Sequence, residues 1–358
     1  MKNQTYSPIL TSIVISSRYL SVWIAIALLF IAAFFVAPET LSRTSFTTVM
    51  PLTSFLALTA LGQMLVIMTG GIDLSTPGVM TLAALMTVGI AGKSDERLPI
   101  ALAAALGVSL LVGLTSGILV GVLKLNPLIV TLAVGQIVNG AMLAYSENVA
   151  HESAVPASFA TWITSPLFGL TNVEWTAIAV SLLLILLFRY TEVGRKFQSV
   201  GANPRAAWIL GLRVNGYIIL AYMGATFLYG LSGVLLAGFL RSPSLVLGIP
   251  YLLGPIATVV IGGASLTGGL ASAASTWASA FFLTLLNQML RVLGLPTALQ
   301  YVVFGIAIIG GMVISGDRII TVIENLLLST SRLRELSAER NQPVGSDNAN
   351  IKEGGHEA

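Results

Sequence analysis

The chain has 358 residues, of which 55% are hydrophobic and only 9% are charged. Soluble domains carry about 25% charged residues, so this composition excludes an ordinary water-facing surface and indicates a membrane protein. The absence of cysteine excludes disulfides, thiolate zinc sites and iron–sulfur clusters. With two histidines and a net charge of +3, we expect no metal, no cofactor and no nucleic-acid partner.

Apolar blocks follow one another along the chain, each near the roughly 20 residues that span a bilayer. The first follows Lys2 and Arg18 and is longer than a signal-peptide core of about 7–15 residues, so we expect it to be retained. Glycine, proline and charged residues separate the blocks. We predict an all-α polytopic fold of ten spans, at residues 19–37, 48–69, 75–92, 98–122, 126–146, 174–190, 216–238, 249–264, 271–290 and 298–315.

Positive charges predict the orientation of these spans, because cytoplasmic loops carry the excess of Lys and Arg. With the N-terminus in the cytoplasm, 13 of the 18 basic residues fall inside, and the rest, outside, are Arg43, Lys93, Arg97, Arg241 and Arg291. The loop 147–173 has acids but no Lys or Arg and should lie outside. We therefore expect cytoplasmic termini, with an N-terminal segment at 1–18, a transmembrane region at 19–316 and a polar, partly disordered tail at 317–358.

Two glycine-rich breaks in the apolar sequence resemble each other. Residues 70–75 read Gly-Gly-Ile-Asp-Leu-Ser, and residues 262–267 read Gly-Gly-Ala-Ser-Leu-Thr. Paired breaks of this kind can mark a transport pathway built on interrupted helices, although glycine is common in this chain. The candidate pathway or gate residues are Gly70, Gly71, Asp73, Ser75, Gly262, Gly263, Ser265, Gly268 and Gly269.

Asp73 is the one acid placed between closely spaced predicted spans rather than in a loop or tail. An ionisable residue near the membrane interior is a functional candidate, so Asp73 could lie on the solute path or hold a gate by accepting backbone N–H groups. Alternatively, it caps the third span through the Ser75-Thr76-Pro77 start. Both interpretations stay open.

A short helix with both ends marked is predicted inside the basic cytoplasmic loop at about 191–215. Asn203 is a favourable N-cap, Pro204 suits the first helical position, and Gly211 can adopt the left-handed conformation that ends a helix. The helix is too short to cross a membrane. Its small residues, Ala206 and Ala207, suit docking into a groove on another protein.

The segment 194–214 resembles the coupling-helix motif of ABC importer permeases, in the form found in the ribose-type sugar permease family. Residues 69–75 (Thr-Gly-Gly-Ile-Asp-Leu-Ser), 127–132 (Pro-Leu-Ile-Val-Thr-Leu) and 259–269 (Val-Val-Ile-Gly-Gly-Ala-Ser-Leu-Thr-Gly-Gly) resemble further signatures of that family. The likeness covers about residues 60 to 316, and the family's ten-span pattern agrees with the predicted count. At 251–254 the chain reads Tyr-Leu-Leu-Gly, without the two acids that many members carry, which leaves the exact sugar open.

The resemblance implies the permease subunit of a binding-protein-dependent ABC importer in the bacterial inner membrane. It implies a sugar or similar small polar solute, and ATP hydrolysis in a separate ATPase subunit, so the chain itself is not expected to be an enzyme. The implied partners are that ATPase, a periplasmic solute-binding protein, a second permease copy or paralogue, and membrane lipid. Residues assigned to coupling with the ATPase are Gly194, Gly201, Asn203, Pro204, Arg205, Ala206, Ala207 and Gly211.

Other functions were weighed against this one. The Gly92-Lys93-Ser94 run lacks the earlier glycine of a phosphate-binding loop, because Thr87 stands there. His151-Glu152 lacks the second histidine of a zinc protease motif. An importer for nucleosides or branched-chain amino acids remains an alternative. An ion-coupled secondary transporter is the rival class, but it would usually carry several intramembrane acids, histidines or lysines, and only Asp73 approaches that description.

Overall fold

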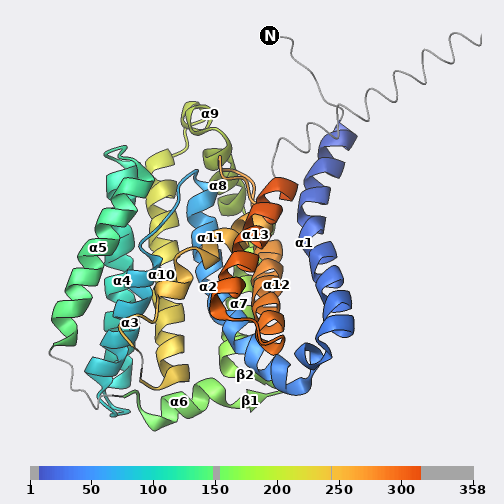
Figure 1. Ribbon diagram of the computed structural model, residues 1–358. Helices are drawn as coiled ribbons and strands as arrows, with labels where there is room; N and C mark the ends of the chain where they lie inside the picture. Colours follow the sequence, from blue (N-terminus) through green and yellow to red (C-terminus); the bar gives the residue numbers. More distant parts are fainter. Residues whose placement is uncertain (1–7, 148–153, 243, 316–358) are drawn as a thin grey trace, which may run out of the picture. The chain divides into compact units, whose positions relative to one another are not determined.

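The computed structural model of the protein describes residues 8–147, 154–242 and 244–315. Apart from one short hairpin, the described regular structure is helical (Figure 1). The predicted tail at 317–358 lies outside the described residues. The helices are α1 (Pro8–Val36), α2 (Arg43–Met68), α3 (Thr76–Ala91), α4 (Leu98–Gly121), α5 (Pro127–Ser146), α6 (Ala157–Thr164), α7 (Asn172–Tyr190), α8 (Glu192–Ala202), α9 (Pro204–Ile209), α10 (Val214–Leu240), α11 (Gly254–Ile261), α12 (Ala273–Val292) and α13 (Thr297–Ser315), with short 3-10 turns at Pro38–Leu41 and Ile249–Tyr251.

Six of the described helices, α1, α2, α4, α5, α7 and α10, are long and apolar enough to cross a membrane. Helix α3 has 16 residues and α11 only eight. At about 1.5 Å per residue α11 is roughly 12 Å long, which is less than half of a hydrocarbon core of about 30 Å. The polytopic all-α prediction is therefore confirmed. The predicted span at 249–264 is an interrupted segment whose helix begins only at Gly254.

Helix α10 lies at the centre of the packed helices and contacts α2, α3 and α4. Glycines allow these close approaches. A β-carbon on Gly117 of α4 would lie only 2.8 Å from the Cα of Ile219 on α10, and one on Gly62 of α2 would lie 2.8 Å from the carbonyl oxygen of Ala225. Small residues permit this packing in lipid, where there is no hydrophobic driving force between helices. Two fully buried tyrosines of α10, Tyr222 and Tyr229, sit in this core.

The predicted outer loop at 147–173 contains structure of its own. Helix α6 is followed by a hairpin of β1 (Pro166–Leu167) and β2 (Leu170–Thr171), which pair antiparallel. Phe168 and Gly169 at its tip both have positive φ angles, as a two-residue hairpin turn requires. Figure 1 shows α6 and the hairpin at the opposite end of the long helices from α8 and α9.

Candidate functional site

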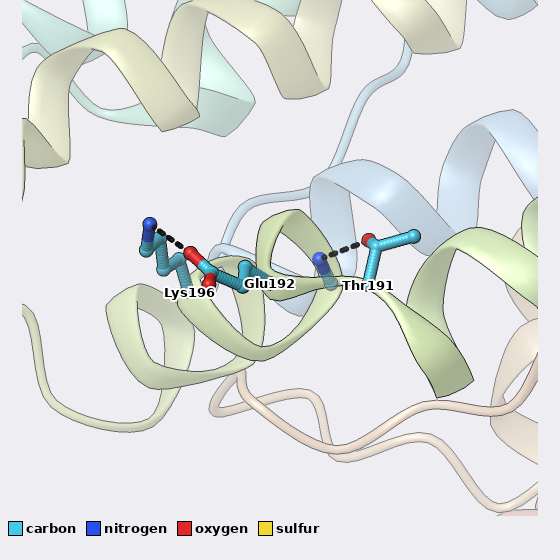
Figure 2. Close-up of polar contacts among 4 residues, drawn as sticks. Thr191, Glu192 and Lys196 are labelled. Atoms are coloured by element: carbon cyan, nitrogen blue, oxygen red, sulfur yellow. Dashed lines mark hydrogen bonds and ion pairs between the residues drawn. The ribbon is translucent and has the colours of Figure 1, made fainter.

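Helix α8 begins the candidate coupling loop. The Thr191 hydroxyl accepts a hydrogen bond from Gly194 N at 3.3 Å, and Lys196 forms an ion pair with Glu192 at 2.8 Å (Figure 2). The hydrogen bond from Lys196 and its positive charge lower the pKa of Glu192. Both charged groups are exposed, so this ion pair lies at the first turn of α8 but contributes little to holding the helix in place.

The inner face of α8 anchors it to the membrane helices. Phe197 is buried between Phe188 of α7 and Tyr217 of α10, with ring centroids 5.6 and 5.9 Å apart in edge-to-face geometry. Gly194 allows α8 to turn closely against α7, since a β-carbon there would lie 2.6 Å from the Leu187 carbonyl oxygen. The inner face of α8 is therefore packed directly on α7 and α10.

The short helix predicted after α8 is present as α9 with the predicted ends. Asn203 Oδ1 accepts a hydrogen bond from Ala206 N at 3.0 Å, and Pro204 is the first helical residue. Gly211 has φ +80°, and the N–H groups of Gly211 and Leu212 donate to the carbonyls of Trp208 and Ala207. This is the paired hydrogen-bond pattern that ends a helix with a left-handed residue.

The outward face of α9 differs from the predicted one. Ala206 is exposed, but Ala207 is buried against Val200 and Val214. The expectation that both alanines form a docking face is wrong for Ala207, because residues one apart on a helix point about 100° apart. The prominent exposed residues are Trp208, Ile209 and Leu210, at 72%, 76% and 78% exposure. Arg205 is also exposed.

The two glycine breaks end their helices in the same way. At the end of α2, the N–H groups of Gly70 and Gly71 donate to the carbonyls of Ile67 and Val66, and Gly70 has φ +80°. At the end of α11, the N–H groups of Gly263 and Ala264 donate to Val260 and Val259, and Gly263 has φ +85°. Structurally, Gly70 therefore corresponds to Gly263, so the sequence alignment of Gly70 with Gly262 is off by one residue.

Five backbone positions from these breaks and from the coupling loop meet in what we call the glycine junction: Met68, Gly70, Gly201, Gly268 and Gly269. Gly269 N donates to the Met68 carbonyl at 2.9 Å. A β-carbon on Gly201 of α8 would collide with that same carbonyl oxygen and lie 2.7 Å from Gly269 N. Gly268 and Gly269 both have positive φ angles. Backbone-to-backbone packing thus joins the coupling loop to the end of α2 and to the loop between α11 and α12.

Ser265 and Gly262 are the remaining candidates of the second break, and the Ser265 carbonyl accepts a hydrogen bond from the junction residue Gly268 at 3.1 Å. The Ser265 N–H donates to the Leu270 carbonyl at 2.9 Å, and its hydroxyl lies 2.7 Å from that of Thr267. Gly262 packs against the start of α12, where a β-carbon would lie 3.1 Å from Thr276 N. These contacts hold the loop from 262 to 272 in a compact turn under α8.

Asp73 is completely buried in the break between α2 and α3. Its Oδ1 accepts hydrogen bonds from the Ser75 N–H at 2.8 Å and the Ser75 hydroxyl at 2.6 Å, which fixes the residue that precedes α3. Its Oδ2 has no hydrogen-bond partner among the described residues. Asp73 therefore fixes Ser75, the N-cap residue of α3, although no described side chain caps that helix, and one carboxylate oxygen remains available for a further donor.

Polar side chains that the sequence analysis missed surround Asp73. With its amide oriented to satisfy its neighbours, Gln63 donates to the Asp73 carbonyl and accepts from the Asp73 N–H at 3.1 Å. The same amide lies 2.8 Å from the Tyr229 hydroxyl. The buried Tyr222 hydroxyl, which has no partner within the described chain, lies where a β-carbon on Gly71 would approach it to 2.5 Å. In the sequence, the glutamine at position 63, within the apolar run of α2, was the signal that could have indicated this buried polar cluster.

The break at Asp73 lies well inside the helices rather than at their ends. Thr131 of α5 accepts from Leu74 N at 3.1 Å, and a β-carbon on Gly135 would lie 3.3 Å from the Ser75 Cα. Gly135 follows the start of α5 at Pro127 by eight residues, which is roughly 12 Å along the helix. Helix α3 therefore begins about 12 Å inside the level at which α5 begins.

The segment before α11 reaches the same level from the other side. Gly248 N donates to the Thr81 hydroxyl at 3.0 Å, and a β-carbon on Gly248 would lie 2.7 Å from the Cα of Pro77 at the start of α3. Two interrupted segments thus meet at mid-depth, where α3 and α11 begin. Broken helices that meet inside a membrane are a common way to build a transport site.

Comparison with known proteins assigns this architecture to a family. The profile of the family described as branched-chain amino acid transport system / permease component matches residues 45–312. The chain is 32% identical to the galactofuranose transporter permease of Escherichia coli K12, over 75% of this chain and 79% of that protein. It is 30% identical to the ribose import permease of the same strain, over 74% and 84% of the two chains.

A third relative and the structural comparison complete these findings. The chain is 28% identical to the autoinducer 2 import system permease of E. coli O9:H4 strain HS, over 84% of this chain and 87% of that protein. No solved structure gives a significant match. The chain is therefore a multi-pass protein of the bacterial inner membrane and belongs to the branched-chain amino acid transport system / permease component family.

Proposed function

We propose that this chain is the membrane-spanning permease subunit of a binding-protein-dependent ABC importer that carries a sugar or similar small polar solute into the cytoplasm. The family description names branched-chain amino acids, but the relatives described above are named for galactofuranose, ribose and autoinducer 2. Those names favour a sugar over an amino acid. A nucleoside is the alternative within the same class.

The topology in this proposal has ten spans, with both termini and the coupling loop in the cytoplasm. Contacts among the proposed outer loops support it. Lys93 N donates to the Ala154 carbonyl at 3.0 Å, and Val155 N donates to the Arg241 carbonyl at 3.2 Å. Loops separated by well over 100 residues therefore gather at one end. The glycine junction joins the proposed inner loops in the same way.

One observation carries the proposal. Helix α9 is a short, capped and exposed helix, and the preceding helix, α8, is in backbone contact with both interrupted segments. Two ATPase subunits would bind the Ala206, Ile209 and Leu210 surface of two permease copies, identical or paralogous. When ATP draws the ATPases together, α8 and α9 move as a rigid body. Because Gly201 packs against both Met68 and Gly269, the end of α2 and the loop between α11 and α12 would follow this movement.

Asp73 is the proposed gate residue in this mechanism. In the described conformation Asp73 and Ser75 hold the break before α3, with Oδ2 unpaired. Movement at the end of α2, five residues away, would reposition the carboxylate relative to Gln63 and Tyr222. The free oxygen would then accept a solute hydroxyl or a backbone N–H, so the structural and gating interpretations operate together.

The outer face would receive a periplasmic solute-binding protein. The proposed contacts are basic residues on that side, which suit acidic groups on such a partner because complementary charge favours encounter and register. Membrane-interface anchoring is their alternative role. The four residues are Arg43, Arg97, Arg241 and Arg291.

The proposal is tested by Ala206→Asp in proteoliposomes that contain the permease, its ATPase and its solute-binding protein. A carboxylate forced into an apolar interface is left unpaired, so ATP-driven uptake and ATPase co-purification should each fall more than tenfold. Ala157→Asp, at an exposed alanine of α6 on the opposite end, is the matched control and should retain both. Normal uptake by Ala206→Asp would exclude the coupling role.

The rival class makes a different prediction for the chain alone. An ion-coupled transporter would accumulate solute in vesicles under a proton or sodium gradient with no ATPase present. The proposal requires no gradient-driven uptake under those conditions. Gradient-driven accumulation by the purified chain would replace the ABC mechanism.

A further inference from the structure

A cleft of about 1030 Å³ lies beside α9, between that helix and the adjoining ends of α4 and α10. It is separate from the glycine junction and from Asp73. Its apolar wall is formed by side chains of α9 and by the start of α10. The lining residues used below are Lys124, Pro204, Arg205, Trp208, Arg213 and Ile218.

The cleft is positively charged. Lys124 follows α4, Arg205 and Arg213 belong to the coupling loop, and no acidic side chain lines the cleft in the described structure. The only described neutral partner of these cations is Asn215, whose Oδ1 accepts from Lys124 Nζ at 2.6 Å. Three cations over an apolar wall fit an amphipathic anion, with its charge at the rim and its chain along the wall.

The position of the cleft favours a membrane lipid over a soluble anion. Helices α4 and α10 have 24 and 27 residues, or roughly 36 and 40 Å, which exceeds a hydrocarbon core of about 30 Å by several ångström. The end of α4 and the first turn of α10 therefore lie at headgroup level. Trp208, which lines the cleft and is 72% exposed, is the residue type enriched at that level.

The cleft shares Pro204 and Arg205 with the residues assigned to coupling, but the proposed ATPase surface of Ala206, Ile209 and Leu210 does not line it. Pro204 and Trp208, four residues apart, share the side that faces the cleft. Ala206 and Ile209, three residues apart, share another exposed side and do not line the cleft. A lipid and an ATPase could therefore contact α9 at the same time.

We propose that this cleft binds an anionic phospholipid of the inner leaflet, with the phosphate held by Lys124, Arg205 and Arg213 and an acyl chain lying against Ile218. The inference rests on the proposed cytoplasmic orientation of the coupling loop. A bound lipid would brace the outer side of α9 against α10, so the lipid composition of the membrane would set how firmly the coupling helix is held.

The test is native mass spectrometry of the purified full chain, titrated with phosphatidylglycerol and, for comparison, zwitterionic phosphatidylethanolamine. Each basic residue near a membrane surface strengthens anionic lipid binding by about fivefold. The variant Lys124→Gln/Arg205→Gln/Arg213→Gln should therefore bind phosphatidylglycerol on the order of a hundredfold more weakly, with phosphatidylethanolamine unchanged.

A matched control removes three charges from the same side but outside the cleft. The variant Arg189→Gln/Arg195→Gln/Lys196→Gln should keep phosphatidylglycerol binding within about threefold of the original chain. Equal losses in both variants, or no loss in the first, would overturn the site. Displacement of the lipid by an equal concentration of water-soluble glycerol phosphate would overturn the lipid assignment.

Two further readouts separate this inference from the proposed function. If the cleft variant keeps its lipid but loses co-purification with the ATPase, the cleft belongs to the ATPase interface and the lipid site is refuted. Ala206→Asp should keep full phosphatidylglycerol binding, because Ala206 does not line the cleft. Loss of coupling in Ala206→Asp therefore does not refute the lipid site, and loss of lipid binding in the cleft variant does not refute the coupling role.

Discussion

Replacing Gly201 with alanine perturbs the glycine junction with a single methyl group. That β-carbon would collide with the Met68 carbonyl oxygen and lie 2.7 Å from Gly269 N, so it intrudes on the hydrogen bond between those two atoms. All the nearest atoms are backbone, which cannot move aside by a change of rotamer. Helix α8 must therefore shift away from the end of α2 and from the loop between α11 and α12.

The size of the effect can be worked from these contacts. Overpacking of this kind costs roughly 1–3 kcal/mol, and the strained Gly269–Met68 hydrogen bond adds about 1 kcal/mol. Alanine recovers about 1 kcal/mol by favouring the helical backbone of α8. The net penalty of roughly 1–3 kcal/mol corresponds to about a 5- to 150-fold shift away from the docked junction.

The assay is the number of solute molecules imported per ATP hydrolysed in proteoliposomes that contain the permease, its ATPase and its binding protein. Gly201→Ala should lower this ratio at least about fivefold, the lower limit of the shift in docking, while the ATPase still co-purifies because α9 keeps its exposed surface. Gly216→Ala is the matched control, since its β-carbon meets only Arg213 Cβ at 3.8 Å. An unchanged ratio for Gly201→Ala would refute the view that the junction transmits movement.

Three further substitutions follow from the same geometry. Asp73→Ala should lower the free energy of unfolding by roughly 2–4 kcal/mol, because the Ser75 N–H and hydroxyl lose their buried acceptor. Thermal denaturation in detergent measures this loss. Asp73→Asn, which keeps Oδ1, should lose less than half as much stability, and equal losses in the two variants would contradict this reasoning. Gly211→Ala should lower the free energy of unfolding by about 1–2 kcal/mol, because φ at this position is +80°, while the space around it is open. Amide hydrogen exchange at residues 210–212 should become faster. Unchanged exchange would count against the described helix end. Phe197→Ala should weaken the packing of α8 on α7 and α10 by about 3–5 kcal/mol. Proteolysis in the 191–213 loop should then be faster than in the original chain. An unchanged rate of proteolysis would show that Phe197 does not anchor α8.

Local features of the coupling helix were predictable because they depend on neighbouring residues. An asparagine cap, a proline at the first position and a glycine two residues beyond the end define α9 in sequence, and all three act as predicted. The positions of the long apolar helices were predictable for the same reason, since about 20 apolar residues suffice to identify a membrane helix.

Features that depend on distant contacts could not be predicted in this way. The Ala207 side chain is buried only because Val200 and Val214 meet it from either side of α9. The role of Gly201 depends on the carbonyl of Met68, far away in the sequence, and backbone atoms carry no residue-specific signal. The one-residue difference between the two glycine breaks arises because the left-handed position is fixed by where each helix ends, not by the glycine pair itself.

The interrupted spans also show the limit of hydropathy. Residues 249–264 are mostly apolar and carry no charge, so hydropathy predicts a continuous span. In the structure Gly248 packs against Pro77, and the α-helix begins only at Gly254. Gly248 N donates to the Thr81 hydroxyl of α3, so a neighbouring helix satisfies part of the non-helical backbone that precedes α11.

The side of the membrane on which the coupling loop lies is the central claim, and it can be measured directly because the chain has no cysteine. Single substitutions Ala206→Cys and Ala157→Cys place thiols at exposed alanines of α9 and α6. With a membrane-impermeant maleimide, Ala206→Cys should react only in inverted vesicles and Ala157→Cys only in right-side-out vesicles. Labelling of Ala206→Cys from the outside would contradict the orientation, the ATPase contact and the mechanism together.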